Sequence, residues 1–146
     1  MELYYTSSIN NRYEVVAAFF SPLESSSDGY QECVQIVVDN SNGLNVNLAE
    51  YMIEKIDLIR ESYMDFVLLA SDTINVWLAG NPVYILSYKY SDPISGILKV
   101  METGTIIRGK GYYIQYFAES AKYSNYLPTI QTMIDSFTLI HTNDTI

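Results

Sequence analysis

The sequence predicts an α+β fold in which two helices pack on a mainly antiparallel β-sheet. β-rich runs recur between clusters of turn-forming residues such as Ala79-Gly80-Asn81-Pro82, and only two segments have helical periodicity. The turns between the runs are short enough to connect antiparallel neighbours. With 146 residues, 49% of them hydrophobic, the chain can bury one core. We therefore expect a single domain over residues 1–146, ending in a flexible tail over residues 141–146.

The N-terminal half predicts a hairpin followed by a helix. Tyr13–Phe20 is rich in β-forming residues and ends at Ser21-Pro22, and Glu32–Asp39 alternates between its two sides. From Asn47 the period changes, and Asn47 is a suitable N-cap for a helix over Leu48–Tyr63. The apolar stripe of this helix consists of Leu48, Met52, Ile56, Ile59 and Tyr63.

The C-terminal half predicts further strands and a closing helix. The strand-like runs are Phe66–Leu69, Ile74–Leu78, Val83–Tyr90, Ile97–Ile107 and Tyr112–Ala118. An apolar stripe over Asn125–Phe137 indicates a terminal helix, with Pro128 tolerated in its first turn. We expect this helix to cover the core.

Charge and composition exclude several classes of partner. Eight basic residues against 17 acidic ones give a net charge of -9, which repels nucleic acids and anionic lipid surfaces. No apolar run approaches the ~18 residues of a membrane span, and the N-terminus as given has no signal-peptide pattern. The single cysteine, Cys33, excludes an internal disulfide and a cysteine-based zinc cluster. It lies in an alternating apolar run, so we expect an inert core thiol.

One segment imitates a phosphate-binding P-loop. Gly104-Thr-Ile-Ile-Arg-Gly109-Lys110-Gly111 has the spacing, but Gly111 stands where the motif needs Ser or Thr. β-branched residues fill the loop, and a strand-like run follows it instead of a helix. We therefore predict a hairpin turn at Gly109–Gly111 that binds no nucleotide.

The acidic loop before the second strand is a candidate for a weak cation site. Hard cations prefer several oxygen ligands from one flexible segment, and Glu24, Asp28 and Glu32 supply them. The loop does not match an EF-hand, and ordinary solvated loop charges are the simpler interpretation.

Catalysis has few suitable residues in this chain. The only histidine, His141, lies in the tail, where no second group orients it. Most acidic residues fall in loops or on polar helix positions such as Glu50, Glu54, Asp57 and Glu61. The sequence therefore predicts neither an enzyme nor a bound cofactor.

Fourteen tyrosines are the strongest compositional feature. Tyrosine is apolar at the ring and polar at the hydroxyl, so it suits both the margin of a core and a recognition surface. Sheet packing is the simpler interpretation, and an aromatic binding face or cleft is the alternative. The candidate binding residues on the two tyrosine-rich runs are Tyr84, Tyr88, Tyr90, Tyr112 and Tyr116.

Several segments occur in a recognisable order. Ala79-Gly80-Asn81-Pro82-Val83-Tyr84 is followed by a long hairpin, by Lys110-Gly111-Tyr112-Tyr113-Ile114-Gln115-Tyr116, and by Tyr126-Leu127-Pro128 with Met133-Ile134-Asp135-Ser136-Phe137. Phe19-Phe20-Ser21-Pro22 and the helix from Leu48 fit the same series. In these segments the chain resembles the PsbP-like family, and its archaeal and bacterial group most of all. Such proteins commonly begin with Tyr-Pro and then Trp, which are absent before Pro22, so the first strand is either trimmed or divergent.

The resemblance implies the Mog1/PsbP-like fold, an α/β/α sandwich with a central antiparallel sheet. It also implies non-catalytic binding to other proteins, often outside the cytoplasm. The plant relatives dock on the oxygen-evolving photosystem through basic residues and an N-terminal extension, whereas this chain is acidic and has no such extension. The contacts of the eukaryotic relative that binds a small GTPase match no residues here. The specific partner therefore does not transfer with the fold.

Two functional hypotheses of different classes follow. The first is an accessory or protein-binding module that acts through the tyrosine-bearing sheet or its edge, as a monomer or a weak homo-oligomer. The second is a small-ligand or metal-binding carrier that uses a pocket between sheet and helix. A flat or convex surface at the tyrosines favours the first, and a pocket with convergent polar atoms favours the second.

Overall fold

Over the residues that the structure describes, the fold is an antiparallel sheet of seven strands with one helix on each face. The computed structural model describes residues 2–4, 12–41, 46–74 and 80–137. The strand order across the sheet is β1-β2-β3-β7-β6-β5-β4, and every neighbouring pair is antiparallel. The elements are β1 (Glu2–Tyr4), β2 (Tyr13–Phe20), β3 (Cys33–Asp39), α1 (Leu48–Ser62), β4 (Val67–Ile74), β5 (Val83–Asp92), β6 (Gly96–Ile107), β7 (Lys110–Glu119) and α2 (Tyr123–Ser136).

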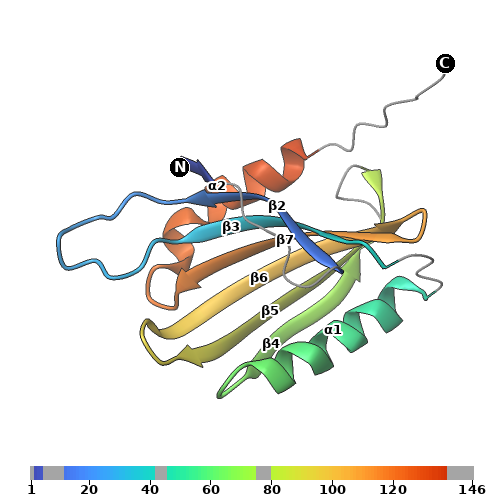
Figure 1. The fold of residues 1–146 in the computed structure, drawn as a ribbon, viewed down its shortest axis with the longest axis horizontal. Helices are drawn as coiled ribbons and strands as arrows, with labels where there is room; N and C mark the ends of the chain where they lie inside the picture. Colours follow the sequence, from blue (N-terminus) through green and yellow to red (C-terminus); the bar gives the residue numbers. More distant parts are fainter. Residues whose placement is uncertain (1, 5–11, 42–45, 75–79, 138–146) are drawn as a thin grey trace.

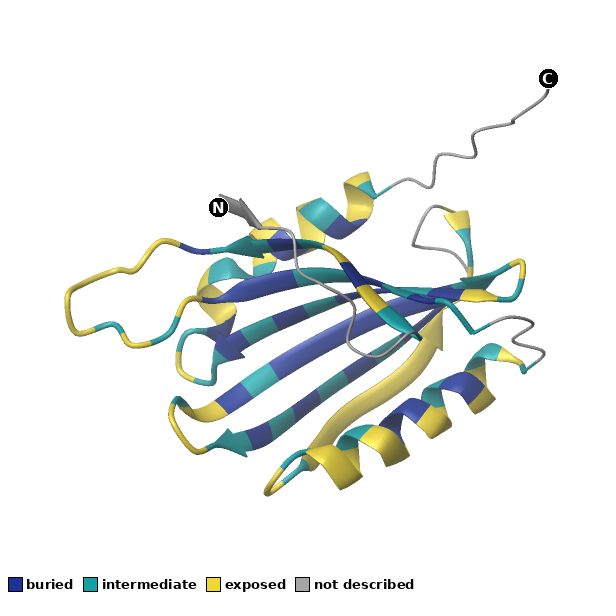
Figure 2. Ribbon diagram, viewed as in Figure 1, coloured by how far each residue is buried: buried dark blue, intermediate teal, exposed yellow. Residues whose placement is uncertain are grey.

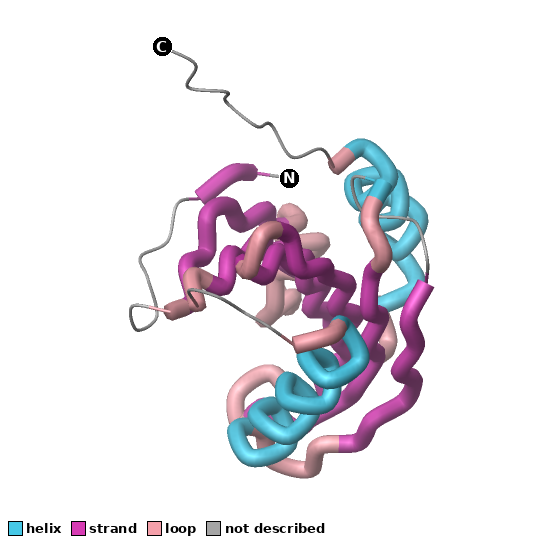
Figure 3. The backbone as a smooth tube through the Cα atoms, turned by 90° about the vertical axis from the view of Figure 1, so that its right-hand side faces the viewer, coloured by secondary structure: helices cyan, strands magenta, loops and turns pink. Residues whose placement is uncertain are grey.

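The two helices cover opposite faces of the sheet, as Figures 1 and 3 show. Residues Tyr51 and Ile56 of α1 pack with the β5 side chains in one hydrophobic cluster. Ile130 and Ile134 of α2 pack with β7 in a second cluster. The predicted α/β/α sandwich is therefore confirmed. Figure 2 shows that burial is concentrated on the central strands.

Helix α1 begins where the sequence predicts. The Asn47 side chain accepts a hydrogen bond from the Glu50 backbone N–H at 2.9 Å, which satisfies one free donor of the first turn. Helix α2 begins at Tyr123 instead of Asn125, so Pro128 lies inside the helix and not in its first turn. An N–H bond from Asn125 to the Lys122 carbonyl three residues earlier shapes that first turn.

Strand β4 differs from the prediction. The sequence separates Phe66–Leu69 from a second run over Ile74–Leu78, whereas the structure forms one continuous strand over Val67–Ile74. All eight residues of this strand are exposed, so polar Ser71 and Asp72 carry no desolvation penalty there. For the same reason, the sequence of the strand does not alternate between apolar and polar residues. Residues 75–78 of the predicted second run lie outside the described residues.

The segment that imitates a P-loop forms the β6–β7 hairpin. Its turn consists of Arg108 and Gly109, both with positive φ (51° and 77°), as a two-residue hairpin turn requires. Gly104 lies inside β6, where a Cβ atom would be 2.6 Å from Tyr113 Cβ. At Gly111 a Cβ atom would be 2.5 Å from the Tyr51 hydroxyl. The predicted hairpin is confirmed, one residue earlier than expected, and its glycines admit neighbouring aromatic side chains.

Candidate functional site

A buried ion pair lies between α1 and the sheet. Lys55 of α1 and Glu102 of β6 are both buried, and Lys55 Nζ lies 3.2 Å from Glu102 Oε2. The Tyr84 hydroxyl donates to Oε2 at 2.7 Å, and Gln115 Nε2 donates to Oε1 at 2.6 Å. Each carboxylate oxygen therefore has a donor, as a buried charge requires.

Tyrosine rings surround the Lys55 ammonium group. Nζ lies 3.1 Å from the ring centroid of Tyr113, with the rings of Tyr51, Tyr84 and Tyr13 at 5.6, 5.9 and 6.0 Å. Aromatic faces attract cations, so the protein's own ammonium occupies this cage. Burial lowers the pKa of Lys55, and this effect outweighs the opposing attraction of Glu102.

A second charged network lies at the end of the same helix–sheet interface. Arg12 donates two hydrogen bonds to Asp39, at 2.9 and 3.1 Å, and the Tyr51 hydroxyl donates a third at 2.8 Å. Burial raises the pKa of Asp39, but the hydrogen bonds from Arg12, the Ser41 backbone and Tyr51 prevail, and its pKa lies below the usual value. The side chains of these networks bond to one another and have the character of a structural core.

A shallow hollow opens beside the ion pair. It measures about 230 Å³, which is below the roughly 300–1,000 Å³ of typical ligand pockets. Lys55, Glu102 and Gln115 are among its lining residues. The other lining residues are Tyr13, Leu58, Ile59, Ser62, Tyr63 and Tyr113.

The five tyrosines predicted as binding residues are divided between the two faces of the sheet. Tyr84, Tyr88 and Tyr90 lie on β5 beneath α1 and are 0, 1 and 8% exposed. Tyr116 of β7 is completely buried beneath α2, and Tyr112 is half-buried four residues earlier on the same strand face. The structure therefore brings the three β5 tyrosines together and separates them from the other two. Their role in binding stays a prediction.

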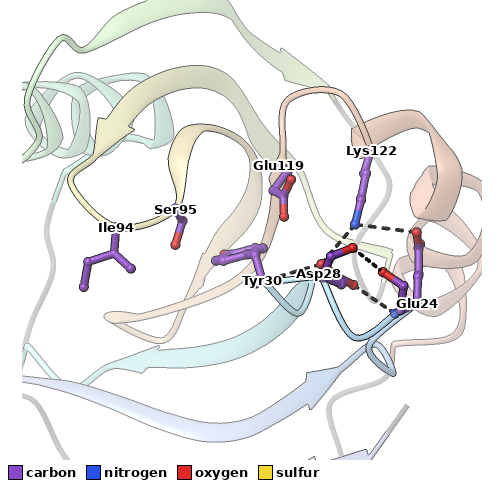
Figure 4. A pocket seen from close by; sticks show the side chains of 10 residues that line it. Glu24, Asp28, Tyr30, Ile94, Ser95, Glu119 and Lys122 are labelled. Atoms are coloured by element: carbon purple, nitrogen blue, oxygen red, sulfur yellow. Dashed lines mark hydrogen bonds and ion pairs between the residues drawn. The ribbon is translucent and has the colours of Figure 1, made fainter.

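In the predicted cation loop, the ammonium group of Lys122 lies beside the acidic side chains, as Figure 4 shows. Lys122 Nζ lies 3.0 Å from Asp28 and 3.5 Å from Glu24, beside a surface hollow of about 540 Å³. The Glu24 backbone N–H and then Lys122 lower the pKa of Asp28. Glu32 lies apart from them, buried and hydrogen-bonded to Ser21 at 2.9 Å. Over the described ranges, no three metal-ligating side chains lie close enough together to hold an ion.

Strand β4 forms an apolar edge of the sheet. Its exposed side chains include Val67 at 54%, Leu69 at 43% and Ile74 at 40%, and Asp72 is its only charged residue. Figure 2 shows this edge exposed along its length beside α1. An edge strand without Lys or Pro is a template for pairing with another chain.

Sequence reasoning missed the buried ion pair and the exposed edge. Lys55 lies three residues after Met52 and four before Ile59, within the apolar stripe of α1, and this position was the available signal. Glu102 interrupts an apolar run between Val100 and Gly104. His141 lies outside the residues that the structure describes.

Comparisons with known proteins show the fold and leave the activity open. No family model matches the chain, and no curated protein matches it. The crystal structure of PA94 from Pseudomonas aeruginosa, described as a protein of unknown function and a candidate regulator, is similar with a TM-score of 0.72. Its identity is 16%, with 97% of this chain and 99% of that chain covered.

Another similar structure is the solution structure of cyanobacterial PsbP (CyanoP) from Synechocystis sp. PCC 6803. The TM-score is 0.50 at 12% identity, and the match covers 95% of this chain and 92% of that chain. The PsbP-like fold predicted from the sequence is therefore confirmed. Neither description names a catalytic activity. Among the described residues, neither helix is long and apolar enough to cross a membrane.

Proposed function

We propose that this chain is a non-catalytic protein-binding module that contacts its partner through edge strand β4. The observation that carries the proposal is the contrast between the charged networks at the α1–sheet interface and the edge strand β4. In the helix–sheet interface Lys55 pairs with Glu102 and Arg12 pairs with Asp39. By contrast, β4 exposes apolar side chains and, among the described strands, has no neighbour on its outer side. Adding a strand to such an edge gives backbone hydrogen bonds, and the side chains beside it give specificity.

The experiment compares the proteins that immobilised wild-type and variant chains capture from the source cells. Leu69→Lys places a charge on the edge, as natural proteins do to block edge pairing. Leu23→Lys is the matched control, because Leu23 is 55% exposed on the loop between β2 and β3. We expect Leu69→Lys to lose a protein that the wild type and Leu23→Lys both retain. Capture that survives Leu69→Lys unchanged contradicts the proposal.

The hollow beside Lys55 supports a second candidate function, a small-ligand carrier. Aromatic and polar residues in one lining are features of ligand sites, although the volume is small. Leu58→Trp fills this hollow, and Ile53→Trp adds the same ring elsewhere on the exposed side of α1. A compound that raises the melting temperature of the wild type and Ile53→Trp, but not of Leu58→Trp, supports a carrier. A library in which no compound distinguishes the two variants argues against it.

An extracytoplasmic location is part of the proposal, and the resemblance to PsbP-like proteins supports it. Fractionation of the source cells, followed by antibody detection, tests the location. Recovery in the cytosolic fraction alone contradicts it.

A further inference from the structure

The surface hollow beside Lys122 has the size and the polar lining of a ligand site. We infer that it binds a neutral, hydroxyl-rich ligand of the saccharide class. None of its described lining residues belongs to β4 or α1, so this site goes beyond the proposed function and does not depend on it. Three features of the hollow support the inference: its volume, the mixture of donors and acceptors in its lining, and one aromatic ring.

The hollow lies where segments distant in the sequence meet. Its lining comes from the loop between β2 and β3, from the turn between β5 and β6, and from the residues between the end of β7 and the start of α2 (Figure 4). Its volume of about 540 Å³ lies within the roughly 300–1,000 Å³ of typical ligand pockets. It therefore has room for a small molecule of disaccharide size.

The lining contains hydrogen-bond donors and acceptors together. The carboxylates of Glu24, Asp28 and Glu119 are acceptors, and the ammonium group of Lys122 is a donor. Three serine hydroxyls, including that of Ser95, can both donate and accept. A ligand that complements this lining therefore needs groups that do both.

This mixture argues against a purely charged ligand. An organic cation offers donors alone, and among the carboxylates it also meets the like charge of Lys122. A phosphate or carboxylate ligand offers acceptors alone and is repelled by the acidic side chains. A hydroxyl group donates to a carboxylate and accepts from an ammonium group, so a saccharide complements both.

Tyr30 gives the hollow an aromatic wall. It is partly buried and packs against the hydrophobic cluster beneath α1. The face of an aromatic ring carries partial negative charge, and the C–H groups of a sugar ring present partial positive charge to it. The other large apolar side chain among the described lining residues is Ile94. This mainly polar lining does not suit a lipid-like ligand.

Contacts within the protein hold these polar groups in place before a ligand binds. Lys122 Nζ lies 3.0 Å from Asp28, and Asp28 accepts a hydrogen bond from the Glu24 backbone N–H at 2.9 Å. A fixed arrangement lowers the entropy cost of binding. Within the part of the chain that the structure describes, the Glu119 carboxylate has no hydrogen-bond or ion-pair partner. It is therefore available to accept from a ligand hydroxyl.

The test titrates the full chain with four neutral disaccharides: maltose, lactose, cellobiose and sucrose. Backbone amide signals are followed by nitrogen-15 NMR, with spermidine and inorganic phosphate as charged control ligands. Glu119→Gln replaces the charged acceptor, and Glu61→Gln is the matched control, because Glu61 is exposed on α1 and does not line the hollow. Tyr30→Leu removes the aromatic ring, whereas Tyr30→Phe keeps it.

We expect at least one disaccharide to shift the amide signals of Tyr30, Ser95 and Glu119 in a saturable titration. Glu119→Gln and Tyr30→Leu should each weaken binding by about tenfold, and Glu61→Gln and Tyr30→Phe by less than about twofold. Melting temperatures show whether each variant is folded. If Tyr30→Leu unfolds the chain, the comparison of Glu119→Gln with Glu61→Gln still decides the matter.

Titrations in which no disaccharide shifts these signals overturn the inference. Spermidine or phosphate that binds the hollow more tightly than every disaccharide also overturns it, because the ligand class is then charged. An equal loss in Glu119→Gln and Glu61→Gln contradicts the assigned location. Leu69→Lys should leave disaccharide binding unchanged, so failure at the hollow and failure of the proposed function at β4 are distinguishable.

Discussion

Asp39 and Lys55 show how single residues set the properties of the α1–sheet interface. Both charges are buried, and each has a partner of opposite charge, Arg12 for Asp39 and Glu102 for Lys55. Breaking such a pair costs more than forming it contributes, because the remaining charge stays buried without compensation. We therefore expect substitutions at these residues to change stability, and under the proposed function we expect substitutions on the sheet edge to change binding.

Asp39→Asn should make the free energy of unfolding less dependent on pH in the acidic range. The folded-state pKa of Asp39 is lowered, so its carboxylate contributes stability above the unfolded-state pKa of about 3.9. That contribution is lost as the pH falls through the lower folded-state pKa. We expect the substitution to cost about 2 kcal/mol at pH 7 and progressively less as the pH falls below about 4. Urea unfolding of both proteins from pH 7 to 2 measures the difference, and a constant difference contradicts it.

Lys55→Met should destabilise the protein by roughly 3 kcal/mol, because Glu102 remains buried without its cation. Adding Glu102→Gln should recover a substantial part of the loss, since glutamine removes the unpaired charge. Chemical unfolding of the single and double variants measures the coupling between the two residues. A single variant as stable as the wild type shows that the ion pair has no structural role.

At the scale of elements, the sequence predicted those that have a periodic burial pattern. Helix α1 has an N-cap and an apolar stripe, and strands β3, β5 and β7 alternate between two buried faces. The sequence prediction divides the β4 segment into two runs, because a strand exposed on both faces has no alternation of apolar and polar residues. The Lys55–Glu102 pair escaped prediction because contacts between a helix and a distant strand depend on tertiary structure.

The β6–β7 hairpin provides a prediction at this scale. A Cβ atom at Gly104 would lie 2.6 Å from Tyr113 Cβ and 2.8 Å from the Tyr84 ring. Gly104→Ala should therefore shift the strand or its neighbours and cost on the order of 2 kcal/mol. Gly29→Ala is the control, because no atom lies within 4 Å of its added Cβ. Equal melting temperatures of the two variants contradict the close packing.

At the scale of the whole molecule, helices cover both faces of the sheet, whereas the edge strand β4 is exposed. Helices α1 and α2 cover its two faces, and the short β1 ends the sheet on one side. On the other side, β4 carries exposed apolar side chains. This asymmetry favours one docking region over a binding surface spread around the molecule.

Hydrogen–deuterium exchange with the partner that the wild-type chain captures tests the central claim most directly. The exchange rates of backbone amides are compared with and without this partner, for the wild type and for Leu69→Lys. The account predicts slower exchange over Val67–Ile74 in the wild type, because an added strand bonds to the outer amides, and no change in Leu69→Lys. Slower exchange around Lys55 and Gln115, with β4 unaffected, would contradict it and favour the hollow as the binding site.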